Sequence, residues 1–121
     1  MLRSNRGAVS LDLDGDGNEG TGWVLLYMHL APAGRVGVGT WLAQDAPVGH
    51  PSCEGGVSTG THLHIARKYN GEWIPAEGAL PLILDGWEAI ALSGNFAGML
   101  VKDGRQVLVG PSSEEYTWIT R

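Results

Sequence analysis

The sequence predicts an all-β protein: a small antiparallel sheet assembly with Gly-rich loops. Nineteen glycines and six prolines among 121 residues are typical of many short strands joined by turns. Several segments alternate apolar and polar residues with the strand period, and little of the chain shows the helix period. A hydrophobic content of 43% at this length is enough to form a core without disulfide or metal staples.

Composition argues against several function classes. The net charge of −5 and the lack of a basic cluster disfavour a nucleic-acid partner. No apolar run approaches the ~20 residues that a transmembrane helix needs. Cys53 is the only cysteine, so neither an internal disulfide nor a Cys-rich zinc knot is expected. The first six residues carry charge but no apolar signal-peptide core, so no signal peptide is expected in this chain.

The first expected strand covers residues 7–14. Val9, Leu11 and Leu13 share one face there, and Ser10 and the neighbouring aspartates share the other, which predicts a half-exposed strand.

The Gly/Asp-rich segment 12–19 then predicts a hairpin. It opens like a calcium-binding EF-hand loop, but the twelfth position is Trp23 instead of Glu, and no helix pattern flanks it. We interpret the segment Asp12 to Asp16 as part of the hairpin, and the calcium alternative stays open.

The second expected strand covers residues 23–30, an apolar run rich in aromatic and branched residues. His29 lies at its end. An imidazole at the end of a buried strand is costly unless it has a polar partner, so His29 is a candidate site residue.

Residues 31–57 alternate turns with short apolar pairs and predict a long connection. His50, Cys53 and Glu54 in this stretch are residue types that bind zinc. We favour a plain loop over a metal site made from these three residues.

The central segment of the chain is residues 58–65 (STGTHLHI), which predicts a strand after a Thr-Gly loop. In a strand, His62 and His64 point to one side, and Leu63 and Ile65 point to the other. This arrangement predicts nitrogen donors on one face and buried core on the other.

Paired imidazoles can bind a metal, act as acid and base, or simply be hydrogen-bonded. Because His29 is a third candidate, we favour a site, and we expect His29, His62 and His64 to cluster in one shallow groove.

The remaining elements follow from turn chemistry. An Asn-Gly turn at residues 69–72 leads into a returning strand that ends at Pro75. Residues 80–87 read as an apolar capping stretch, residues 99–109 as a hairpin across Asp-Gly, and residues 114–121 as a last strand. We expect a core segment at residues 1–78 and a C-terminal β extension at residues 79–121.

Two motifs in order resemble a known family. Residues 27–30 (YMHL) followed by residues 58–64 (STGTHLH) are similar to the C-terminal half of a lysostaphin-type (LytM-like) zinc metalloendopeptidase domain. That family has a Tyr-x-His-Leu strand, then a Gly-rich stretch, then a Ser-x-Gly-x-His-x-His strand. The resemblance covers roughly residues 7–76 and implies the duplicated-hybrid-motif fold, N-terminally incomplete here.

The resemblance also implies a function. It assigns His64 as a zinc ligand, and His62 and His29 as the catalytic pair that hydrogen-bonds the attacking water and the developing oxyanion. It implies hydrolysis of peptide cross-links in bacterial cell-wall peptidoglycan. The full-length protein is then expected to be extracellular or in the cell envelope.

One departure from the family pattern matters. The family's other two zinc ligands come from an upstream His-x-x-x-Asp motif, and no histidine precedes His29 in this chain. We expect a fragment of a longer enzyme in preference to a degenerate homologue, because the other motifs are intact. The alternative function is a non-catalytic envelope module that binds peptidoglycan or a partner hydrolase.

Overall fold

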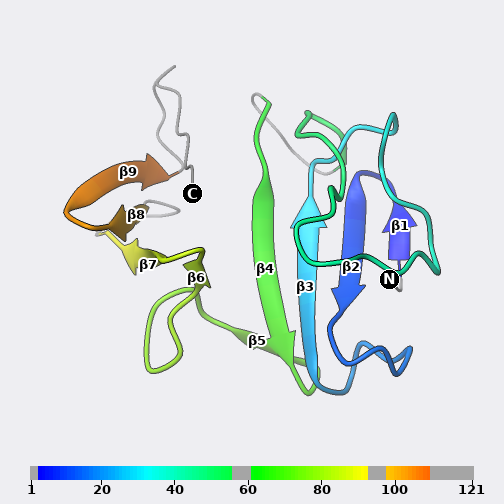
Figure 1. Cartoon of the computed structure of the whole chain (residues 1–121), viewed down its shortest axis with the longest axis horizontal. Coiled ribbons are helices and arrows are strands. Elements are labelled where there is room, and N and C mark those ends of the chain that lie inside the picture. The colour runs from blue at the N-terminus through cyan, green and yellow to red at the C-terminus, as the bar shows by residue number, and fades with distance from the viewer. Residues whose placement is uncertain (1–2, 56–60, 93–97, 110–121) are drawn as a thin grey trace. The chain divides into compact units, whose positions relative to one another are not determined.

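A computed structural model describes residues 3–55, 61–92 and 98–109 (Figure 1). The chain divides into two compact units, Met1–Ile74 and Pro75–Arg121. The described residues form strands and turns and contain no helix, which confirms the predicted all-β fold class. No helix that could span a membrane occurs within these ranges.

The first unit is built on a five-stranded sheet in which every neighbouring pair is antiparallel. The strand order along the sheet equals the order along the chain, so each strand pairs with the next one. The strands are β1 (Arg3–Asn5), β2 (Ala8–Asp12), β3 (Trp23–Met28), β4 (His64–Tyr69) and β5 (Glu72–Ile74).

β2 forms as predicted but differs from the prediction in its faces. Val9, opposite Tyr27 of β3, is fully buried as expected. Ser10 is 1% exposed, so the predicted half-exposed strand is covered on both sides at this point. Leu13, predicted on the apolar face, is 55% exposed because the strand ends at Asp12 and the hairpin turn begins there.

Local turn chemistry sets two of the hairpins of this sheet, the one between β2 and β3 and the one between β4 and β5. The Gly/Asp-rich segment returns the chain into β3, as predicted, and the Leu13 amide still donates to the Trp23 carbonyl at 3.0 Å. Asn70 and Gly71 both adopt positive φ between β4 and β5, the conformation of a type I′ turn. The Asn70 side chain also accepts the Gly22 amide at 2.9 Å, which ties the two turns together.

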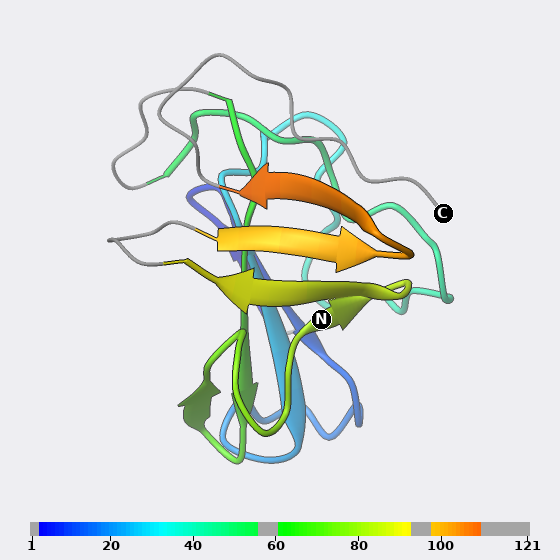
Figure 2. The same ribbon diagram turned by 90° about the vertical axis from the view of Figure 1, so that its left-hand side faces the viewer.

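The second unit is a four-stranded antiparallel sheet, which Figure 2 shows face on. The predicted Asp-Gly hairpin forms at residues 103–104. Residues 80–87 were expected to be a capping stretch, but they contain a second Asp-Gly hairpin at residues 85–86 that leads into the buried Trp87. The strands are β6 (Ile83–Leu84), β7 (Trp87–Ala91), β8 (Gly98–Lys102) and β9 (Arg105–Val109). The last predicted strand, residues 114–121, lies outside the described residues.

Two glycines allow the turn between β1 and β2 to meet the long connection between β3 and β4. A Cβ atom on Gly7 would lie 2.7 Å from the Glu54 carbonyl oxygen, and one on Gly55 would overlap the Arg6 carbonyl oxygen. Both glycines have positive φ. This close approach fixes residues 52–55 beside the end of β3.

We predict that Gly55→Ala destabilises the chain far more than Gly39→Ala. Both positions have positive φ, which costs a non-glycine residue about 1–2 kcal/mol. Gly39 has open space around it, whereas the Gly55 site adds a backbone overlap that costs about 1–3 kcal/mol more. Urea unfolding followed by circular dichroism measures both variants, and equal losses would contradict the packing of this turn.

Candidate active site

The structure brings the three candidate histidines together. His29 follows β3, His62 lies in the connection, and His64 is the first residue of β4. The ring centroid of His29 lies 4.2 Å from that of His62 and 6.3 Å from that of His64. The three imidazoles therefore lie close together, as predicted, while the shallow groove and the assigned roles remain predictions.

An unusual backbone turn places His29. Its φ of 66° lies in the left-handed region, which is uncommon for a residue other than glycine. The Ser52 amide and hydroxyl both donate to the His29 carbonyl oxygen, at 2.6 and 2.9 Å. Isolated bridges join Leu30 to Pro51 and Ser52 to His62, so residues 51–52 run between two parts of the histidine cluster.

The His29 side chain has the polar partner that its burial requires. The residue is only 5% exposed, and its ring Nδ1 lies 3.0 Å from the Glu54 carbonyl oxygen. A carbonyl oxygen only accepts, so Nδ1 carries the proton of this bond. In the neutral ring, Nε2 is then left with a lone pair that can accept a proton or a hydrogen bond.

The environment of His64 disfavours its charged form. Partial burial lowers the pKa of His64 below the ordinary value of 6.5, and the nearby imidazoles of His29 and His62 lower it further by charge repulsion. The ring is therefore neutral at neutral pH. Neutral imidazole is the form that binds metals and accepts protons.

The prediction that Leu63 is buried is wrong. Leu63 is 41% exposed, and Ile65 is half-buried. β4 begins at His64, and His62 forms only an isolated bridge to Ser52, so the strand alternation assumed for residues 62–65 does not reach back to Leu63. Residues 58–60 of the motif lie outside the described part of the chain.

The alternative ligands in the long connection do not gather into a metal site. His50, Cys53 and Glu54 are all exposed, and no group of three possible ligands in the described ranges includes any of them. The Cys53 thiol lies 3.9 Å from the Thr61 hydroxyl. These facts agree with the favoured interpretation of this segment as a loop.

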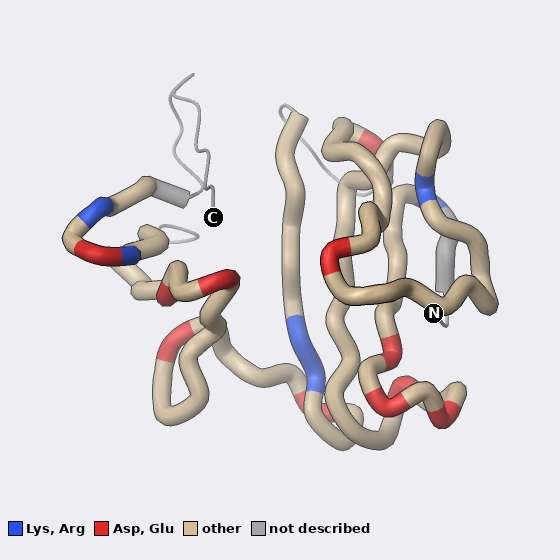
Figure 3. The backbone as a smooth tube through the Cα atoms, in the orientation of Figure 1, with Lys and Arg blue, Asp and Glu red and all other residues tan. Residues whose placement is uncertain are grey.

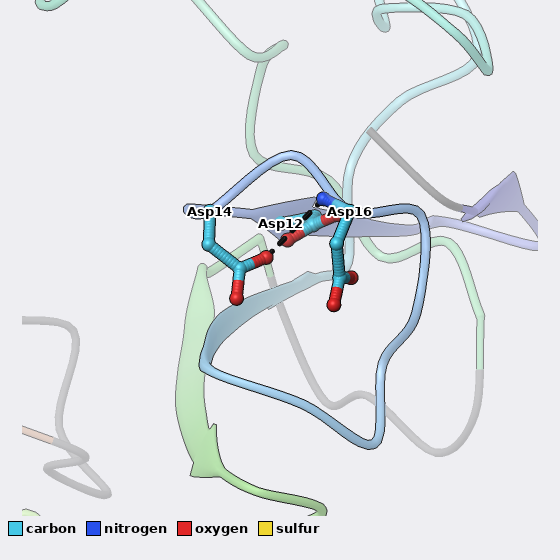
Figure 4. Close-up of side chains that lie close together, drawn as sticks. All are labelled: Asp12, Asp14 and Asp16. Carbon is cyan, nitrogen blue, oxygen red and sulfur yellow. Dashed lines mark hydrogen bonds between the residues drawn. The ribbon is translucent and has the colours of Figure 1, made fainter.

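A second cluster of ligand atoms lies in the hairpin between β2 and β3 (Figure 4). Carboxylate oxygens of Asp12, Asp14 and Asp16 all lie within 4.8 Å of one another. Asp12 accepts the amides of Gly17 and Gly15 at 2.8 and 3.1 Å, and chiefly the Gly17 bond lowers its pKa. The hydrogen bond to Asp12 raises the pKa of Asp14. These bonds belong to a hairpin, and the calcium alternative stays open.

The described residues do not complete a catalytic zinc site. Such a site takes three protein ligands and one open position. In the described ranges the three imidazoles do not place three donor atoms within 4.8 Å of one another. His64 fits the requirement for one ligand, because its ring is exposed and its pKa is lowered.

A hollow of about 650 Å³ lies on the other face of the sheet from His64. Tyr27 lines it, while His64 pairs with the next residue of β3, Met28, whose side chain points the opposite way. Trp41, which is 85% exposed, also lines this hollow. The hollow is therefore separate from the histidine cluster.

Sequence comparison connects about half of the chain to a protease. Protease LasA from each of two strains of Pseudomonas aeruginosa is 35% identical to the chain over 66 residues. The match covers 49% of this chain and 16% of the relative, so the chain spans about a sixth of the length of the relatives that it matches. No family model matches the chain, and no solved structure matches it.

We predict a pH dependence of stability that His64 causes. The pKa of His64 in the folded chain lies below its unfolded value of 6.5. Its contribution to stability is therefore fully present above pH 6.5 and is lost as the pH falls through the lowered pKa of the folded state. Urea unfolding at about pH 8 and about pH 5 should show a smaller loss for His64→Asn than for the native chain. Equal losses would contradict the lowered pKa.

Proposed function

We propose that this chain is part of a zinc metalloendopeptidase that hydrolyses peptide cross-links of bacterial cell-wall peptidoglycan. The observation that carries the proposal is the meeting of His29, His62 and His64 in a chain that is similar over half its length to a protease. His64 is the proposed zinc ligand within this chain. The remaining ligands come from outside these 121 residues.

The proposed roles follow from the state of each imidazole. Bound zinc supplies a more acidic water and polarises the scissile carbonyl. When the His29 ring is neutral with its proton on Nδ1, it offers Nε2 as an acceptor for a proton or a hydrogen bond. His62 is exposed, and its ring lies tilted against that of His29 at a centroid distance of 4.2 Å, where it can hydrogen-bond the reacting groups. A protonated imidazole of this pair can stabilise charge on the carbonyl oxygen.

The substrate class and the location rest on the family resemblance. A peptide of the cell wall implies a site outside the cytoplasm, so we propose an extracellular or envelope location for the full-length protein. The relative's name, Protease LasA, adds only that it is a protease.

One observation favours the alternative, a non-catalytic envelope module that binds peptidoglycan or a partner hydrolase: among the described residues, the three imidazoles do not form a group of three metal ligands. The upstream coding sequence separates the two proposals. An in-frame His-x-x-x-Asp motif behind a signal peptide supports the enzyme, and its absence supports the binding module.

We predict weak, non-stoichiometric zinc binding by the 121-residue chain, because one imidazole ligand does not hold zinc tightly. Isothermal calorimetry measures this directly, with the His64→Ala chain as the matched control. One tightly bound zinc per chain would contradict the proposed ligand set. The candidate ligands would then be His50, Cys53 and Glu54, or the hairpin aspartates Asp12, Asp14 and Asp16.

In a longer protein that carries the upstream ligands, we predict two classes of variant. His64→Ala should abolish both zinc binding and hydrolysis, because it removes a metal ligand. His29→Ala and His62→Ala should keep zinc and lower turnover by about 10²- to 10⁴-fold, the usual contribution of an acid–base group. His50→Ala, in the exposed loop, is the control and should change neither. Loss of zinc in the His29 variant would reverse the assigned roles.

A further inference from the structure

We propose that Ser52 is a positioning residue for His29: it holds the left-handed turn of the His29 backbone and, through Glu54, the tautomer of the His29 ring. The catalytic meaning of this inference rests on the function proposed above. The geometry does not, because it involves only bonds within the chain.

The first feature that Ser52 holds is the left-handed backbone conformation of His29. Left-handed φ in a residue with a side chain persists only where the surroundings enforce it. At His29, both donors of Ser52 reach the same carbonyl oxygen, with the amide at 2.6 Å and the hydroxyl at 2.9 Å. Ser52 therefore fixes the direction of the His29 carbonyl at the point where β3 ends.

The second feature that depends on Ser52 is the position of the proton on the His29 imidazole. The Ser52 hydroxyl has one proton and two lone pairs. It gives the proton to the His29 carbonyl and accepts the Glu54 amide at 2.9 Å. The Glu54 carbonyl then faces His29 Nδ1 at 3.0 Å. These hydrogen bonds form a closed loop that starts at the His29 carbonyl oxygen, passes through Ser52 and Glu54, and returns to the His29 imidazole.

The surroundings leave the Glu54 carbonyl little freedom. It lies so close to Gly7 that a side chain there would contact it at 2.7 Å. If the ring carried its proton on Nε2, the Glu54 oxygen would lose this bond and Nε2 would stop being an acceptor. Ser52 also bridges His62, whose amide lies 3.4 Å from the Ser52 carbonyl. One residue therefore connects both members of the proposed catalytic pair without touching the reacting groups.

The test measures the tautomer directly. Imidazole ¹⁵N chemical shifts distinguish a protonated from an unprotonated ring nitrogen, and at about pH 8.5 imidazoles with ordinary pKa values are neutral. The 121-residue chain is used without metal or substrate. We expect His29 of the native chain to be protonated on Nδ1.

Four variants separate positioning from general stability. Ser52→Ala should lower the ratio of the Nδ1–H to the Nε2–H form by about fivefold, the effect of one net hydrogen bond of ordinary strength. Ser52→Thr keeps a hydroxyl and should restore the ratio. Glu54→Ala keeps the backbone amide and carbonyl and should leave the ratio unchanged. If Ser52→Ala does not fold, Ser52→Cys under reducing conditions keeps the shape, replaces the hydroxyl by a weak donor and should also lower the ratio.

Two results overturn the inference. The first is a native His29 protonated on Nε2, which needs no variant to be measured. The second is an unchanged ratio in Ser52→Ala or Ser52→Cys. Neither result depends on zinc or hydrolysis, so failure of the proposed function leaves this test intact, and failure of this test leaves the peptidase proposal standing.

Discussion

The contact between Ser52 and the His29 carbonyl is the interaction on which the rest of the site depends. It joins the end of β3 to the long connection, and the bridge from Ser52 to His62 carries that connection to the start of β4. Within the sheet, Met28 of β3 pairs with His64 of β4, and this pairing brings His64 to the same region. A five-stranded meander alone would bring only two of the three imidazoles near each other. The loop that packs on Gly7 adds the third.

The imidazoles of His29 and His62 lie close enough to His64 to affect its protonation. Partial burial is the main reason that the pKa of His64 is lowered, and charge repulsion from His29 and His62 lowers it further. None of the described contacts gives His29 a carboxylate partner: its Nδ1 bonds a backbone carbonyl. The environment of His64 therefore favours its neutral form, and the lone pair of a neutral imidazole can bind a metal cation.

Much of the fold was predictable because its signals are local. Asn-Gly and Asp-Gly turns need only their own positive φ values, so the hairpins at residues 70–71 and 103–104 could be read from the sequence. The histidine cluster could be predicted for a related reason, since the two motifs lie at the ends of adjacent strands. The exposure of Leu63, the burial of Ser10 and the Ser52 contacts were missed. Each depends on where a distant segment packs. No local sequence pattern around Ser52 distinguishes a serine that hydrogen-bonds the His29 carbonyl from an ordinary loop serine.

The chain also holds two sets of donor atoms that cannot serve one metal. Asp12 pairs with Val24 at the beginning of β3, whereas His29 follows its end. A strand rises about 3.3 Å per residue, so five residues separate the two clusters by about 17 Å. Protein ligands of one zinc bind at ~2 Å from the ion, so they lie within a few ångströms of one another. The hairpin aspartates and the histidine cluster therefore cannot bind the same metal ion, and the other ligands of the proposed zinc centre would have to come from another segment.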